Sequence, residues 1–192
     1  MRRILPMKTV IINGSPRKNG DTAALLNHYK KEMGGTIVSF DTHAGRIASC
    51  LACGGCDKQA GCVIQDDLQS LLKAVDTADV VILASPVHFT ELSGTLLSAL
   101  SRLQCLWAAN NKHRQPLITD KRRQGIILLT AGSNGPFDKA MHTATVLLHQ
   151  MGIDAIQTII SRQTDVLPAA HDTMALGNLS KIIEGIKKDA VD

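Results

Sequence analysis

The chain has 192 residues, of which 44% are hydrophobic and 3% aromatic, and its formal net charge is +4. This composition excludes a disordered chain and predicts one α/β domain with a core of aliphatic side chains. The basic residues form short runs without interleaved aromatic residues, so nucleic-acid binding is not expected.

The N-terminal residues carry charges, and Pro6 and Lys8 interrupt their apolar stretch, so we expect no signal peptide. No apolar run reaches the roughly 18 residues that a membrane helix needs, and we expect no membrane contact. A cytoplasmic location follows from these expectations. In that compartment, clustered cysteines bind metal or catalyse more often than they form disulfides.

The first half of the chain contains two predicted strands, a helix and a long loop. Residues 8–12 form a continuous apolar run rich in β-branched side chains, which predicts a strand buried on both faces. From Asp21, apolar residues recur at helical spacing until Gly34 and Gly35 end the helix. Residues 36–40 predict a second strand. The segment 41–65 shows no clear element, and we expect it to be a cysteine-rich loop inserted after strand two.

The second half alternates helices with strands. Asp66 is a candidate N-cap with Gln69 three positions later, which predicts a capping box and a helix to about Ala74. Further elements follow in order: strands at 79–84, 125–129 and 153–160, and helices at 92–109, 137–151 and 173–188. The connection from Ala109 to Gln124 is polar and basic, and we expect it at the surface.

Alternating strands and helices predict a three-layer α/β/α sandwich around a five-stranded parallel sheet. Five such units fit the flavodoxin-like strand order 2-1-3-4-5, in which ligands bind beyond the carboxyl ends of the strands. Residues just after Ile12, Ala84 and Leu129 are therefore expected to line a site. We expect residues 1–192 to form a single domain, because the sequence contains no repeat or low-complexity tract.

The loop after the first strand has the composition of a phosphate site. Gly14 and Gly20 permit tight turns, hydroxyls and an arginine lie between and beside them, and a helix begins directly afterwards. The free N–H groups and the dipole of a helix N-terminus favour an anion. Asp21 stands where a P-loop has its lysine, so the loop is not a P-loop. Its glycines also do not have the Gly-x-Gly-x-x-Gly spacing of a dinucleotide fingerprint.

Four of the five cysteines lie within thirteen residues, at positions 50, 53, 56 and 62. Thiolates at this spacing can hold one iron–sulfur cluster, although the run differs from the bacterial ferredoxin pattern before its fourth cysteine. Zinc, a redox thiol pair and reduced structural thiols are the alternatives. Cys105 lies on an apolar helix face and is expected to be buried.

Three segments together resemble the NADPH-dependent FMN reductase superfamily, and within it most of all the iron–sulfur flavoproteins. These segments are Asn13–Thr22, Ala84–Phe89 and the cysteine quartet with residues 63–67. The resemblance implies that the phosphate of FMN is bound by Ser15, Arg17, Asn19 and Thr22. It also implies that the isoalloxazine ring is bordered by Pro86, Val87, His88, Phe89, Ala131, Gly132 and Ser133.

The same resemblance implies a [4Fe-4S] cluster held by Cys50, Cys53, Cys56 and Cys62. Two departures from the family pattern stand out: His88 replaces a usual tyrosine, and Leu97 and Ser101 replace a usual lysine and aspartate. We expect His88 to pack or hydrogen-bond beside the ring, and a catalytic role in proton relay is the weaker interpretation.

The resulting hypothesis is an FMN-dependent oxidoreductase in which NAD(P)H is the cosubstrate. Electrons would pass to a quinone, a free flavin, another protein or the cluster. The alternatives are a non-enzymatic electron carrier like flavodoxin, and a zinc or thiol redox-sensing module. The mildly basic charge argues for the enzyme, because flavodoxins are typically acidic. The resemblance further implies a homodimer or homotetramer.

Overall fold

The computed structural model describes residues 7–190 and contains a parallel sheet in the predicted order. Hydrogen bonding links its strands in the order β2-β1-β3-β5-β6, and a two-residue strand, β4 (Glu91–Leu92), adds to β3 in antiparallel sense. The five parallel strands thus confirm the flavodoxin-like order 2-1-3-4-5. Their bounds are β1 Lys8–Asn13, β2 Thr36–Asp41, β3 Val80–His88, β5 Gln124–Thr130 and β6 Ala155–Ser161.

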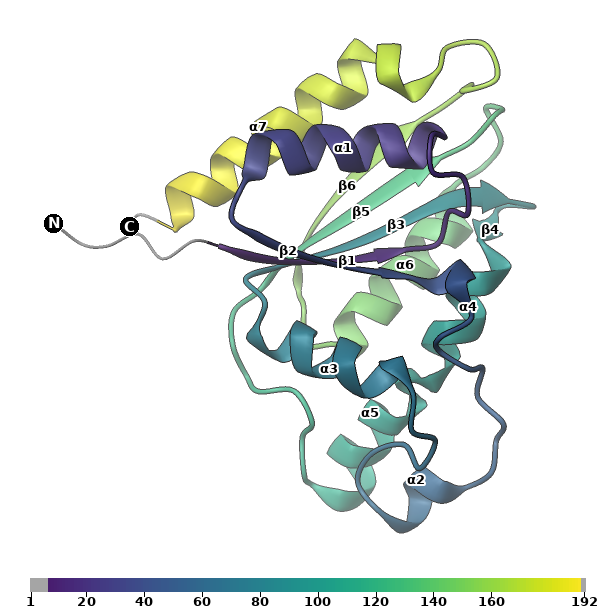
Figure 1. Cartoon of the computed structure of the whole chain (residues 1–192), viewed down its shortest axis with the longest axis vertical. Coiled ribbons are helices and arrows are strands. Elements are labelled where there is room, and N and C mark those ends of the chain that lie inside the picture. Colours follow the sequence, from purple (N-terminus) through teal and green to yellow (C-terminus); the bar gives the residue numbers. More distant parts are fainter. Residues whose placement is uncertain (1–6, 191–192) are drawn as a thin grey trace, which may run out of the picture.

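Helices cover both faces of the sheet and complete the predicted three-layer sandwich (Figure 1). One face carries α1 (Asp21–Met33) and α7 (Thr173–Asp189), and the other carries α3 (Asp67–Thr77), α4 (Gly94–Leu100), α5 (Gln104–Ala108) and α6 (Asp138–Gln150). Ile11 belongs to the core beneath α1 and α7, whereas Val10 and Ile12 belong to the core on the opposite face. Two-sided burial explains why β1 reads as an unbroken apolar run.

Two predicted helix boundaries agree with the structure for the reasons expected. Asp66 caps α3 by accepting a hydrogen bond from the Leu68 amide, and the Gln69 side chain accepts one from the Asp66 amide at 3.0 Å. Helix α1 ends at Gly34, whose φ of 68° suits glycine best. α3 continues to Thr77, three residues beyond the predicted end.

The single helix predicted over residues 92–109 is wrong. Leu92 pairs with Val87 across the β3–β4 hairpin, so the helix starts only at Gly94. A 3₁₀ turn at Ser101–Leu103 then separates α4 from α5, and a π-helical turn follows at Ala109–His113. The apolar spacing continues through these breaks, which is why the sequence suggested one helix.

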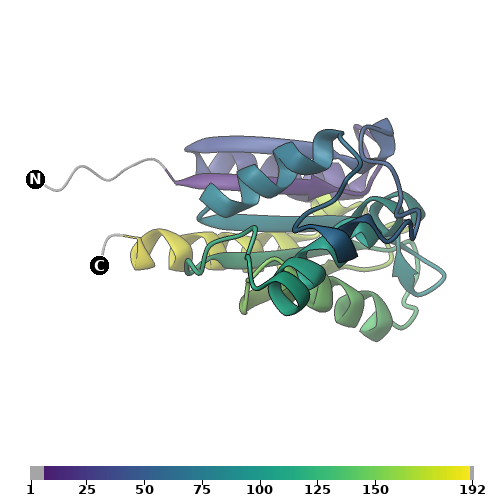
Figure 2. The same ribbon diagram turned by 90° about the horizontal axis from the view of Figure 1, so that it is seen from below.

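The segment 41–65, predicted to lack clear elements, contains two short ones. A 3₁₀ turn covers Thr42–Ala44, and α2 is a single helical turn at Gly55–Lys58. The start of β1 and the end of α7 lie at one end of the molecule, and the loop after β1 lies at the opposite end (Figures 1 and 2). This opposite end carries the carboxyl ends of the parallel strands.

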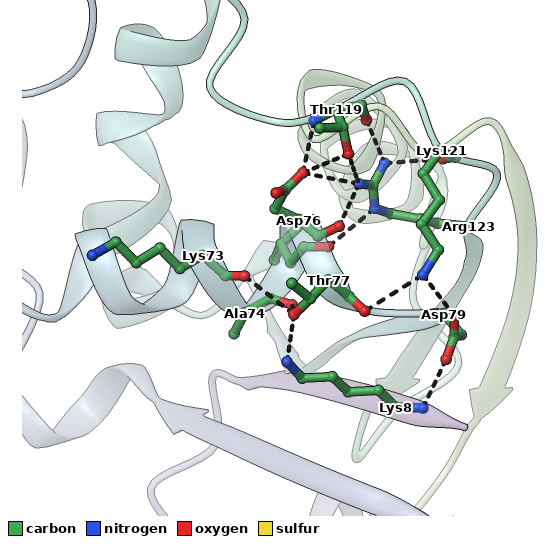
Figure 3. A network of polar contacts seen from close by, with 10 residues as sticks. Lys8, Lys73, Ala74, Asp76, Thr77, Asp79, Thr119, Lys121 and Arg123 are labelled. Atoms are coloured by element: carbon green, nitrogen blue, oxygen red, sulfur yellow. Dashed lines mark hydrogen bonds and ion pairs between the residues drawn. The ribbon is translucent and has the colours of Figure 1, made fainter. Parts of the chain in front are cut away.

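The prediction that the whole connection before β5 lies at the surface is wrong for Arg123. Its side chain is buried and donates to the carbonyls of Val75, Asp76, Thr119 and Lys121 at 2.7–3.0 Å (Figure 3). A charged group needs such partners when it leaves water. Arg123 therefore fastens the connection to the end of α3.

Asp79 joins the same network from the start of β3 (Figure 3). Its carboxylate accepts from the Lys8 amide at 2.9 Å and pairs with the Lys121 ammonium at 2.7 Å. Burial raises the pKa of Asp79, but the bonds from Lys121 and Lys8 outweigh burial and lower it. The amino end of the sheet is thus held by polar contacts.

No helix within residues 7–190 combines the length and the apolar character that a bilayer crossing requires. The expectation drawn from the charged N-terminal residues concerns positions 1–6, which lie outside the described part of the chain.

Candidate functional site

The loop between β1 and α1 lies at the carboxyl end of the sheet, where the strand order predicts a ligand. Asn13 shapes its start: the Ser15 amide donates to Asn13 Oδ1 at 2.9 Å, and Asn13 Nδ2 donates to Asp41 Oδ1 at 2.8 Å. Ser15 is buried, whereas Arg17 and Asn19 are exposed. The loop therefore offers one guanidinium and one amide to solvent beside a helix start.

Gly14 fixes the position of this loop by close packing. Its amide donates to Ala84 O at 2.8 Å, and Ser93 Oγ donates to Gly14 O at the same distance. A Cβ at Gly14 would lie 2.5 Å from Ser93 Oγ and 2.9 Å from Leu96 Cβ, so a side chain has no room there. Glycine is needed here for close approach.

The N-terminus of α1 is open toward the loop. Gly20 is its N-cap, and no side chain within residues 7–190 caps it. The first amides of a helix have no partner inside the helix, so they remain able to bind an anion. Asp21 accepts a hydrogen bond from the Ala169 amide at 3.0 Å, which engages the one carboxylate in this first turn.

Thr22 links the predicted phosphate loop to the end of β5. Its side chain is buried, and its hydroxyl lies 2.8 Å from the hydroxyl of Thr130. Ala131, Gly132 and Ser133 follow Thr130 directly. The two segments expected to bind phosphate and ring are therefore joined at one edge of the sheet.

A tight hairpin follows the buried part of β3. His88 pairs with Glu91, and the two residues between them, Phe89 and Thr90, have φ values of 51° and 68°. A positive φ is costly for residues other than glycine and asparagine, and such strain often occurs at functional sites. Phe89 is fully exposed despite its size. The hairpin thus presents an aromatic side chain at the carboxyl end.

A cavity of about 200 Å³ opens between this hairpin and the end of β5. Five residues predicted to border the ring line it, namely Val87, Phe89, Ala131, Gly132 and Ser133. The two other predicted ring residues are placed differently: Pro86 is buried opposite Thr130, and His88 is exposed beside the hairpin tip.

Sequence reasoning missed four lining residues of this cavity and one residue beside it. The missed lining residues are Thr90, Gly135, Pro136 and Phe137. Arg162 stacks on Phe137, with its guanidinium carbon 4.6 Å from the ring centroid. Extending the rule that ligands bind beyond strand ends past Ser133 would have found residues 135–137, but nothing local indicated Arg162.

The residues at this edge fit FMN. An uncapped helix start, the exposed guanidinium of Arg17 and the hydroxyl of Ser15 suit a phosphate, and a neighbouring cavity with an aromatic wall suits a flat ring.

The cysteine quartet lines a second cavity, of about 280 Å³, between α2 and α5. Cys50, Cys53, Cys56 and Cys62 all border it, and none of these thiols, which lie within the described residues, forms a disulfide. Within residues 7–190, however, no three thiol, imidazole or carboxylate groups lie close enough to form a metal site. The soft donor set of an iron–sulfur cluster is present but not assembled.

Arg102 shares this cavity, and its side chain is only 1% exposed. Nη2 donates to Cys62 Sγ at 3.3 Å and to Ile64 O at 2.8 Å, and Nη1 pairs with Asp66. Burial lowers the pKa of Arg102, but the hydrogen bonds to Cys62 and Asp66 raise it overall. Arg102 Nε is buried without a hydrogen-bond partner among the described residues. The guanidinium beside Cys62 and the four thiols around one cavity are the chemistry that an anionic iron–sulfur cluster needs.

Other thiol environments differ. Burial raises the pKa of the Cys56 thiol, and the neighbouring Asp57 carboxylate raises it further. Cys105 is buried as predicted, and burial raises its pKa to about 11. Cys50 and Cys53 are exposed. Cys105 therefore acts as a core residue, although it borders the cysteine cavity.

A sequence model of the NADPH-dependent FMN reductase family matches residues 7–163. An iron–sulfur flavoprotein of Archaeoglobus fulgidus is 34% identical over 100 residues, which cover 50% of this chain and 46% of that protein. An iron–sulfur flavoprotein of Methanosarcina thermophila is 28% identical over 151 residues, covering 77% and 75%. For the first three curated relatives, the matched segment spans about half of their length.

Solved structures share the fold at low sequence identity. The NAD(P)H:quinone oxidoreductase from Methanothermobacter marburgensis aligns with a TM-score of 0.69 at 15% identity, covering 95% of this chain and 98% of that chain. An azoreductase from Bacillus anthracis aligns with a TM-score of 0.65, also at 15% identity, covering 92% and 98%. At such identity the likeness concerns the fold alone.

Proposed function

Because the chain belongs to the NADPH-dependent FMN reductase family, we propose that it is an NAD(P)H-dependent FMN oxidoreductase. The observation that carries this proposal is the joint placement of an open helix start and an aromatic-walled cavity at the carboxyl end of the sheet. The Thr22–Thr130 contact connects the two. FMN, when bound, would accept a hydride from the nicotinamide and release electrons singly or in pairs.

Each side of the site would have its own task. Ser15, Arg17 and Asn19, together with the first amides of α1, would hold the phosphate. Thr22 would support the phosphate loop from the core side, since its hydroxyl is already hydrogen-bonded to that of Thr130. Val87, Phe89 and residues 131–133 would hold the ring. Pro86 and His88 remain predicted neighbours of the ring, with Pro86 supporting the strand end from within.

We extend the proposal to a [4Fe-4S] cluster on the cysteine quartet. The shared cavity, the guanidinium of Arg102 beside Cys62 and the curated relatives named iron–sulfur flavoproteins support this extension. Gly54 and Gly61, with φ of 68° and 100°, give the loop the backbone freedom to wrap a ligand. Iron and sulfide analysis after anaerobic purification tests it, and zinc in place of iron would contradict it.

The acceptor, the assembly and the location are also proposals. A quinone, a flavin or a protein suits the open cavity, in which the Phe89 side chain is fully exposed. A homodimer or homotetramer would cover this aromatic side chain. Five thiols free of disulfides favour a reducing compartment such as the cytoplasm.

Steady-state oxidation of NADPH in the presence of an added quinone tests the proposed activity. We expect turnover on the order of 10 s⁻¹ with a quinone present, because quinone would reoxidise the flavin between cycles. The matched control omits the quinone. A protein that binds FMN but consumes no NADPH beyond one equivalent would be an electron carrier and would contradict the enzyme proposal.

A further inference from the structure

Arg102 reaches into the cysteine cavity from a break in the helical segment. The 3₁₀ turn Ser101–Leu103 lies between α4 and α5, and it carries a guanidinium that is almost wholly removed from water. Burying a charge is costly unless it is paired and hydrogen-bonded. The contacts of this arginine are therefore informative about its role.

Those contacts join the two ends of the cysteine segment. Before Cys50, Ala48 O accepts from Arg102 Nη1 at 3.5 Å; after Cys62, Ile64 O accepts from Nη2 at 2.8 Å. Asp66 closes the ring, because it pairs with Arg102 and also accepts from the Ala48 amide at 2.9 Å. Arg102 thus clamps the loop at its base.

One of its donors contacts a thiol of the cavity. Nη2 lies 3.3 Å from Cys62 Sγ, and Cys62 is one of the four thiols that line the cavity. The five donors of a guanidinium allow the same side chain to hold the loop and to contact Cys62.

We propose that Arg102 is the positioning residue of the four-cysteine site. It holds the loop so that Cys62 faces the cavity, and it places a permanent positive charge beside the sulfurs. This inference rests on the proposed cluster. Hydrogen bonds to cluster sulfurs and nearby charge tune the potential of such centres, and a positive charge favours the reduced, more negative state.

The test compares Arg102→Met and Arg102→Lys with wild type after anaerobic purification. We expect Arg102→Met to lose its iron to a chelator about 10- to 100-fold faster, and its cluster potential to shift to more negative values. Arg102→Lys keeps the positive charge but loses the planar set of donors that holds the loop. Compared with Arg102→Met, it should therefore have a cluster potential close to that of wild type but should still lose iron quickly. If Arg102→Met retained iron as well as wild type and had the same cluster potential, the inference would be overturned.

Arg123→Lys is the matched control, because Arg123 is also a buried arginine bonded to backbone carbonyls but contacts no thiol. It should leave retention and potential at wild-type values; an equal change in this variant would show a general loss of stability and overturn the inference.

Iron-free wild-type protein would contradict the proposed cluster. The alkylation rates of the thiols would then test the positioning role of Arg102. In the metal-free protein, Arg102→Met should change the ratio of the alkylation rates of half-buried Cys62 and exposed Cys53, because Cys62 loses both the guanidinium beside its sulfur and the clamp on its loop. An unchanged ratio of the two rates would overturn the inference.

Discussion

Replacing Arg123 by alanine should lower the free energy of unfolding by about 3–5 kcal/mol, the range measured when one partner of a buried charge network is removed. The guanidinium donates to the carbonyls of Val75 and Asp76 in one segment and to those of Thr119 and Lys121 in another. Alanine would open a cavity behind α3 and remove these donors, and only Val75 O and Thr119 O would keep a hydrogen bond from a backbone amide of the described residues. Urea denaturation followed by circular dichroism measures the change.

Arg122→Ala is the control for this prediction, because Arg122 is the exposed neighbour in the same basic run. A surface substitution of this kind changes stability by about 0.5 kcal/mol at most. If both variants unfolded at the same denaturant concentration, the anchoring role assigned to Arg123 would be wrong.

Replacing Arg17 by alanine should weaken FMN binding by about 10- to 100-fold, the equivalent of about 1.5–3 kcal/mol for hydrogen bonds to a charged group. Arg17 is exposed in the loop before α1, so its loss should cost phosphate affinity without disturbing the core. Fluorescence titration of the apoprotein with FMN measures the dissociation constant. Riboflavin, which lacks the phosphate, should bind both proteins alike.

Lys18→Ala removes a positive charge from the adjacent, equally exposed position. General attraction of the phosphate by positive charge would weaken binding in both variants to the same extent. A specific contact from Arg17 predicts that Lys18→Ala retains nearly the full affinity. Equal losses would therefore remove Arg17 from the phosphate site.

The sheet was predictable because each of its strands carries a local signal. In β1, for example, Val10–Ile12 is apolar without interruption, since both faces of the strand are covered. Asp66 and Gln69 marked the start of α3, and Gly34 the end of α1. Strand order then followed from the alternation of elements, and with it the edge at which ligands bind.

The misses have in common that they depend on contacts that the apolar spacing of the chain does not encode. Arg123 lies in a basic run that looks exposed, and only its packing against the end of α3, 47 residues away, buries it. The helix predicted over 92–109 is interrupted where Leu92 pairs with β3 and where Arg102 turns toward the cysteines. Neither contact changes the apolar spacing along the chain.

The candidate site was predictable in part for the same reason. Residues 131–133 follow the end of β5 and Val87 lies near the end of β3, so topology alone brought them to one cavity. Phe137 and Arg162 complete that region through a stacking contact across 25 residues, which no local motif encodes. The cysteine spacing identified a soft-ligand set but not the arginine that clamps it.

The flavin content of the protein as isolated tests the central claim most directly. FMN bound at the carboxyl end of the sheet predicts a yellow protein that releases about one FMN per chain on denaturation, identified by its mass. The result that would contradict the account is colourless protein that also fails to bind added FMN.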